Sequence, residues 1–258
     1  QHVVGVVEQQ GIDRVYASYH LAYRLTYLSG GRVVAAQYYN ERFYGWPYPF
    51  RSAVDASDCP AYVLAPKFAV NTDRFVEDAL AMGLTFTRHD AGDLTVFHDF
   101  DVPARTGGTF IQPDGLSVAA SDQSADASVL IDGDYGSRWR SRRAQANDMW
   151  IELTWREPIE LAEIYLYYNY YYHDRAKALD FEVRRDGTWQ SVAADVARDM
   201  NAHEFDLGRP LYGNQFQRVA ISPVVADGLR IRVTNPEPGR DWTVGEVRLW
   251  GRAHAAEN

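Results

Sequence analysis

The sequence has almost no cysteine and no long apolar segment. Cys59 is the single cysteine among 258 residues, so no disulfide bond can form within the chain. We expect Cys59, which precedes an apolar segment, to be a small buried residue. No run of about 18 apolar residues occurs, so the sequence offers no candidate for a membrane-spanning helix.

Positive charge is also in deficit. Lys and Arg total 26 against 35 Asp and Glu, which gives a formal net charge of −9. This balance argues against nucleic acid as a partner, because the phosphates would repel the surface. The sequence also lacks the GxSxG, Walker and GxGxxG patterns, which mark acyl transfer, nucleotide binding and dinucleotide binding.

Aromatic residues are abundant, with 17 Tyr and 7 Trp. Their rings combine a flat apolar face with a polar edge, which suits sugar stacking or protein contacts. The alternative is that a β-sandwich simply accommodates aromatic side chains in its strands. With 46% hydrophobic residues in 258, the chain can bury a core, and its length favours two domains.

The first part of the chain, residues 1–102, is predicted to be a small α/β domain, because helical and strand patterns alternate in it. Residues 103–116 are rich in Gly and Pro and are predicted to be a linker. Helices are expected at 19–28 and 72–83, and strands at 14–17, 32–37, 61–65, 84–88 and 94–97.

Residues 117–252 show recurrent short strand patterns and weak helical periodicity. Such a series predicts an all-β antiparallel sandwich of the jelly-roll type. The strands are expected at 150–155, 163–168, 180–185, 189–192, 203–207, 218–221, 229–234 and 244–250.

A candidate cation-binding segment, DGDYGSRW, occupies residues 132–139. Asp132, Asp134 and Ser137 place oxygen atoms around a glycine turn, which is the donor type that calcium prefers. The alternative is an ordinary solvated turn, because Asp and Gly tolerate left-handed backbone.

The segments around this turn carry a family resemblance. SVAAS at 117–121 precedes it, DMWIEL at 148–153 follows it, and GEVRLWG at 245–251 lies near the end of the chain. Together they resemble the discoidin, or coagulation-factor type C, family, to which family-32 carbohydrate-binding modules belong. The resemblance implies a galactose-binding-like β-sandwich that binds a ligand without catalysis. We expect a structural calcium ion held by Asp132, Asp134, Ser137 and Glu246, with backbone carbonyls completing its coordination.

A candidate sugar-binding segment, YLYYNYYYHDR, spans residues 165–175. In sugar-binding members of the resembled family, a loop here carries a His and an Arg, which His173 and Arg175 match. Tyr172, Trp242 and Arg240 would add a stacking face and further hydrogen-bond donors. The alternative is that the tyrosines line the core, that Trp242 is a core residue, and that His173 closes a turn.

Four arginines between residues 138 and 143 form a local positive cluster. They could hold an anionic group such as a uronate or a lipid phosphate. The alternative is that they form ion pairs with neighbouring acids on the surface.

The first domain carries a second resemblance. GIDRVYASYHLAYRLTY at 11–27, RVVAA at 32–36 and PAYVL at 60–64 resemble the soluble tail of bacterial dolichyl-phosphate-mannose mannosyltransferase-like membrane glycosyltransferases. The resemblance implies an extracytoplasmic location, periplasmic or at the cell surface, and attachment to a membrane-embedded domain outside this chain. We therefore expect a piece of a longer protein.

These features predict a non-catalytic, extracytoplasmic carbohydrate-binding region of a membrane glycosyltransferase, which holds a glycan or glycolipid acceptor. One alternative is a module for protein–protein or membrane-surface adhesion. A second alternative is a freestanding enzyme with its site in the α/β domain, where Ser18, His20, Asp90 and Asp93 are the candidates. A catalytic triad requires a geometry that the sequence alone does not give.

Overall fold

The computed structural model describes most of the chain as two compact units. The α/β unit comprises residues 1–104 and 200–213, and the sandwich unit comprises residues 105–199 and 214–258. The described residues are 2–37, 50–57, 59–65, 72–101, 103, 108–122, 126–133, 137–168, 172–199, 203–206, 209–212 and 216–254.

The α/β unit is built on a five-stranded mixed sheet with the order β2-β1-β3-β5-β4. Strand β1 pairs in parallel with β2 and β3, whereas β5 is antiparallel to β3 and β4. The strands confirm the predicted ones. Their bounds are β1 Arg14–Ala17, β2 Val34–Gln37, β3 Ala61–Leu64, β4 Thr85–Ala91 and β5 Leu94–Asp101.

Helices cover both faces of this sheet. Val15 and Ala17 of β1 join the core formed with α1 and α2, while the ring of Tyr16, which points the other way, lies 5.1 Å from that of Tyr62. Tyr62 in turn contacts Phe75 of α4. This alternation produces three layers. The helices are α1 His2–Gln9, α2 Tyr19–Leu28, α3 Arg51–Asp55 and α4 Thr72–Ala81.

A strand forms in the predicted 203–207 segment, but it does not join the sandwich sheet. Strand β12 (His203–Asp206) pairs with β13 (Arg209–Tyr212) and contacts α4, so this hairpin belongs to the α/β unit. The predicted linker also differs, because β6 (Thr109–Ile111) within it pairs with β16 (Glu246–Ala253) of the sandwich. Backbone pairing, which composition does not reveal, decides both cases.

The sandwich unit contains a large sheet with the order β11-β10-β14-β9-β16-β6, in which β7 also pairs with β9, and a smaller sheet of β15 and β8. This architecture confirms the predicted fold class. The remaining strands are β7 Ser117–Ala120, β8 Trp139–Ala144, β9 Trp150–Tyr167, β10 Ala178–Arg185, β11 Thr188–Ala197, β14 Phe216–Asn235, β15 Asp241–Val244 and β16 Glu246–Ala253.

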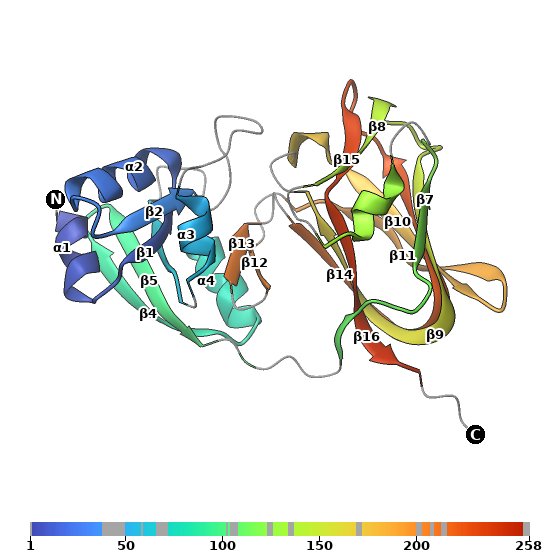
Figure 1. Ribbon diagram of the computed structural model, residues 1–258, viewed down its shortest axis with the longest axis horizontal. Coiled ribbons are helices and arrows are strands. Elements are labelled where there is room, and N and C mark those ends of the chain that lie inside the picture. The colour runs from blue at the N-terminus through green and yellow to red at the C-terminus, as the bar shows by residue number, and fades with distance from the viewer. Residues whose placement is uncertain are drawn as a thin grey trace. The chain divides into compact units, whose positions relative to one another are not determined.

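Two long strands, β9 and β14, organise the sandwich and replace four of the predicted short ones. They pair along most of their length, while the other edge of β9 pairs first with β7 and then with β16. Register shifts interrupt β14 between Ala220 and Val224 and between Ala226 and Gly228, and β9 curves strongly (Figure 1). The curvature allows one sheet to enclose a core.

None of the described helices is both long and apolar enough to cross a membrane. The prediction that Cys59 is buried is wrong, because its side chain is exposed.

Candidate functional site

Gln145 ties together several segments at the end of the small β8–β15 sheet. Its side-chain amide donates to the carbonyl oxygens of Asp174 at 3.1 Å and Asp241 at 2.9 Å, and its Oε1 accepts from the backbone N–H of Glu237 at 2.8 Å. Its own N–H donates to the carbonyl of Arg240. Gln145 is only 7% exposed, so its buried side chain holds these segments together from the interior of the sandwich. We call His173, Asp174, Glu237, Arg240 and Asp241 the loop cluster.

His173 and Arg240 are the exposed members of the loop cluster that carry donors for a ligand. His173 lies in η2 (Tyr172–Asp174). Partial burial lowers the pKa of His173, and the neighbouring Arg240 charge lowers it further. The imidazole is therefore neutral at pH 7 and can both donate and accept a hydrogen bond, beside a guanidinium with several donors.

The acids around this pair are engaged elsewhere. Glu237 lies 2.5 Å from Arg198 and 3.8 Å from Lys177, and Asp174 accepts from the Thr243 hydroxyl at 3.3 Å. Within the described residues, no ion pair involves Arg240. Its guanidinium is thus available for a polar or anionic group of a ligand.

The prediction that Arg175 contacts a sugar is wrong. Its side chain is 0% exposed and points into the interior, where the guanidinium lies 4.3 Å from the centre of the Tyr168 ring and donates to Gln217 at 3.2 Å. Burial lowers the pKa of Arg175 and raises the pKa of Tyr168. Arg175 therefore supports the loop from inside and presents no surface to a ligand.

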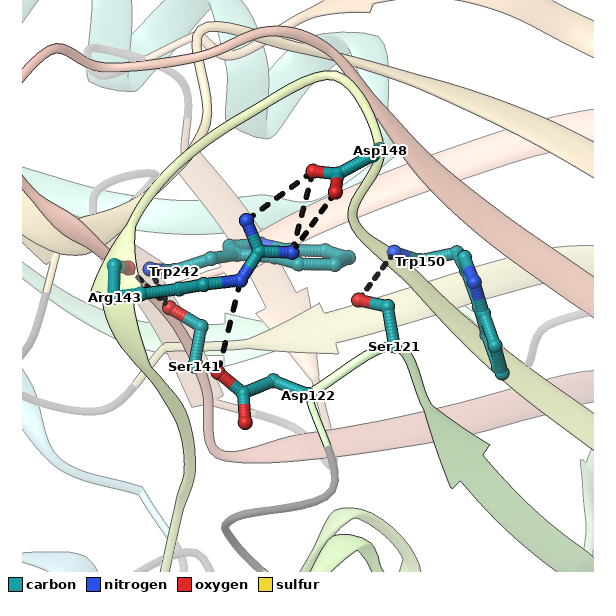
Figure 2. Close-up of polar contacts among 7 residues, drawn as sticks. All are labelled: Ser121, Asp122, Ser141, Arg143, Asp148, Trp150 and Trp242. Carbon is teal, nitrogen blue, oxygen red and sulfur yellow. Dashed lines mark hydrogen bonds and ion pairs between the residues drawn. The ribbon is translucent and has the colours of Figure 1, made fainter.

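The prediction that Trp242 stacks on a sugar is also wrong. Its side chain is 0% exposed and packs against Trp139 at 5.5 Å with nearly perpendicular rings. The backbone N–H of Trp242 donates to Ser141 at 2.9 Å (Figure 2). The alternative interpretation, a core residue, is confirmed. Tyr172 begins η2, and its side chain lies outside the described residues.

Two of the four clustered arginines form ion pairs with neighbouring acids. Arg143 lies between two acids, 3.2 Å from Asp148 and 3.8 Å from Asp122 (Figure 2), and Arg140 pairs with Asp241. For these two arginines the alternative interpretation holds. Exposed pairs of this kind contribute little to stability.

Two of the four predicted calcium ligands are in contact, and a third, Glu246, reaches the backbone of the same turn. Ser137 Oγ donates to Asp132 Oδ1 at 3.1 Å, and Glu246 Oε2 accepts from the N–H of Gly133 at 3.3 Å. The donor set consists of oxygen atoms and includes a carboxylate, Glu246, that is 4% exposed, so its chemistry fits a hard cation. Asp134 lies outside the described residues, and the described acids and imidazoles form no group of three or more close enough to hold a metal.

The candidate residues for an enzyme site in the α/β unit include a buried serine, Ser18, and an aspartate, Asp90, that is hydrogen-bonded to Thr95 and Arg88. Ser18 is 2% exposed at the start of α2, and Asp90 accepts from Thr95 at 2.9 Å and from Arg88 at 3.1 Å. Those hydrogen bonds lower the pKa of Asp90. A buried hydroxyl is a poor nucleophile for an external substrate.

Sequence reasoning missed Gln145. Glutamine is common on surfaces, and no motif marks this one, because its partners lie in segments 29 to 96 residues away. The signal that could have drawn attention to it was the alternation of buried Trp139 and Ser141, which reaches Gln145 in the same phase but is interrupted by the exposed Arg143.

The large curved sheet, the smaller β8–β15 sheet and the core they enclose define an all-β sandwich domain. The model of the F5/8 type C domain matches residues 117–246. The chain belongs to this family, and the resemblance to carbohydrate-binding modules of the discoidin type is confirmed. No curated protein matches the chain.

Solved structures with similarity to the chain include a family 32 carbohydrate-binding module of Clostridium perfringens NanJ in complex with galactose. It is 15% identical with a TM-score of 0.44, and the match covers 55% of this chain and 98% of that one. An F5/8 type C domain from Bacteroides fragilis is 18% identical with a TM-score of 0.45, covering 58% and 100%. A module from a Clostridium perfringens family 31 glycoside hydrolase is 17% identical with a TM-score of 0.42, covering 53% and 91%.

Proposed function

We propose that the sandwich unit binds a glycan through the exposed side chains of His173 and Arg240. The observation that carries the proposal is the arrangement of the loop cluster: an exposed imidazole and an exposed guanidinium are held in place by the buried amide of Gln145. Carbohydrate-binding modules belong to the family of this domain, which supports the same conclusion.

Sugar hydroxyls match these side chains chemically. Arg240 offers planar paired donors, and neutral His173 offers one donor and one acceptor. For a site built on two exposed side chains we expect a dissociation constant of about 10⁻⁴–10⁻³ M, which corresponds to ~4–5 kcal/mol. Because Trp242 is buried, Tyr172 remains the candidate for the ring that stacks on the sugar.

A glycan array tests this proposal. The isolated protein should bind a defined set of glycans, and Arg240→Ala should lose the signal while its melting temperature stays within a degree or so of wild type, because the side chain is exposed. If no glycan binds, or if both proteins bind equally, the adhesion alternative replaces this function.

We also propose that the turn at residues 132–137 holds a calcium ion through Asp132, Asp134, Ser137 and Glu246. The ion would supply positive charge that binds this turn to the buried carboxylate of Glu246. Calcium bound only to the native state raises its stability by mass action, so a chelator should lower the melting temperature of wild type and leave Glu246→Gln unaffected. An unchanged wild-type melting curve in excess chelator would contradict the proposal.

For the whole protein, we propose an extracytoplasmic region of a membrane glycosyltransferase that presents a glycan or glycolipid acceptor. The segments at 11–27, 32–36 and 60–64 support this parent, and family members are typically extracellular. The sequence encoded upstream of residue 1 is the test. Several membrane helices there agree with the proposal, whereas a catalytic domain of another kind contradicts it.

A further inference from the structure

One helix of the α/β unit carries most of the exposed large hydrophobic side chains among the described residues. Four large hydrophobic side chains are exposed in the described residues, and three of them, Tyr23, Tyr27 and Leu28, belong to α2, with exposed fractions of 41%, 84% and 41%. Tyr23 and Tyr27 are one helical turn apart. Tyr19 and Tyr23 are also one turn apart, and their ring centres lie 5.2 Å from each other. Concentrated apolar exposure of this kind marks an interaction surface.

An apolar groove runs beside this helix. It has a volume of about 250 Å³ and lies between α1, α2 and the β4–β5 turn. Leu28 belongs both to the groove and to the exposed surface of α2, so the two are continuous. The apolar side chains that line it include Val3, Val4, Leu21, Leu25, Leu28 and Leu94.

The charge on α2 is of one sign. The helix contains no acidic residue, and Arg24, which also lines the groove, adds a positive charge next to Leu28. The chain as a whole carries −9, so the absence of acids on this exposed helix is local. Asp93 is the acid among the groove residues.

We propose that α2 and the adjoining groove dock onto the interface of a lipid bilayer that contains anionic lipids. Tyr23 and Tyr27 lie at the level of the headgroups, where amphipathic aromatic rings are favoured. One acyl chain enters the groove beside Leu28, and Arg24 pairs with a lipid phosphate. Nothing in this inference depends on glycan binding, because every residue it uses belongs to the α/β unit.

The features of the surface favour a bilayer over a protein partner. A stable protein interface uses roughly 20–30 residues on each side, whereas among the residues that the structure describes, the exposed large hydrophobic side chains of this surface are three on one helix. The groove is also smaller than the ~300–1,000 Å³ typical of pockets for drug-sized ligands. An alkyl chain is narrow enough for such a groove, and the lack of acids on α2 suits an anionic surface.

Vesicle flotation tests the proposal with phosphatidylcholine vesicles that contain or lack phosphatidylglycerol. Wild type should float with the anionic vesicles, less so at high salt, which screens Arg24. The double variant Tyr27→Ser with Leu28→Gln should bind about tenfold more weakly, because it removes apolar groups from the interface. Arg24→Gln should lower the preference for anionic over neutral vesicles.

Leu80→Gln provides the matched control. Leu80 is 60% exposed on α4 and lies outside the groove, so this variant should bind as wild type does. Circular dichroism should show that all variants are folded, because the replaced side chains face solvent. Equal flotation of all proteins, or none for wild type, would overturn the proposal. So would wild-type self-association in sedimentation velocity that the double variant abolishes, since the occupant would then be a second copy of the chain.

Discussion

His173 is the residue whose chemistry responds to pH. Burial and the Arg240 charge hold its pKa below the ordinary value, which is about 6.5. Above that pH both folded and unfolded chains carry a neutral imidazole. As the pH falls through and below about 6.5, the unfolded chain takes up the proton more readily, so His173 lowers the free energy of unfolding.

Glycan affinity should follow the same titration. It should be constant from pH 8 to about 6.5 and decrease below that range, because a protonated imidazole loses its acceptor nitrogen. Calorimetric titrations at several pH values, with His173 followed by NMR, measure both quantities. His173→Gln should bind without the pH step, and an identical pH step in this variant would assign the effect to another group.

Trp242 should matter for stability and not as a direct ligand contact. Trp242→Ala opens a cavity beside Trp139, and buried aromatic truncations cost about 3–5 kcal/mol. Urea unfolding of this variant should show that loss, whereas Trp242→Phe should show a smaller one. A variant that keeps wild-type stability and loses only glycan binding would restore the stacking role that its burial argues against.

Gln145 acts at the level of the elements, because it joins η2, β15 and the segment before β15. Gln145→Leu leaves two carbonyls and one N–H without their partner, and each buried group left unpaired costs about 1–3 kcal/mol. We expect lower stability and several-fold weaker glycan binding, since His173 and Arg240 are no longer held together. The His173 titration should move toward that of a free imidazole.

Gln190→Leu is the control for that prediction. Gln190 is exposed in β11, so the same chemical change there should leave stability and affinity close to wild type. If Gln145→Leu lowers stability but leaves both the His173 titration and the affinity unchanged, Gln145 has a structural role alone.

Several elements could be predicted from the sequence because their patterns are local. Helix α2 follows from the spacing of Leu21, Leu25 and Leu28, and the β4–β5 hairpin from the turn around Gly92. The continuity of β9 could not be predicted, because exposed residues at 156–158 interrupt its alternation while its pairing with β14 resumes beyond them. Strand β8 could not be predicted either, because three of its six residues are arginines and leave little apolar alternation.

The candidate site was predictable to a similar extent. Ser137 donates to Asp132, and Glu246 accepts from the neighbouring Gly133 N–H, while the calcium and sugar sites themselves stay predictions. Arg175 and Trp242 were misassigned, because a sequence gives the neighbours of a side chain along the chain but not the direction in which it points. Burial is a property of the packed sandwich.

At the scale of the whole molecule, two units with different surfaces share one chain. The sandwich unit belongs to the F5/8 type C family and presents the loop cluster, while the α/β unit presents the apolar face of α2. The proposed glycan site and the proposed membrane-docking face would together suit a protein that holds a sugar acceptor near a bilayer. The hairpin β12–β13, which belongs to the α/β unit, connects two strands of the sandwich.

The central claim is that the loop cluster binds a glycan, and a titration tests it most directly. The best glycan from the array should bind wild type with a dissociation constant of about 10⁻⁴–10⁻³ M, and both His173→Ala and Arg240→Ala should weaken binding at least about tenfold, or ~1.4 kcal/mol. Arg185→Ala, an exposed arginine at the far end of β10 from Ala178, should bind as wild type does. Equal affinity in all four proteins would contradict the claim.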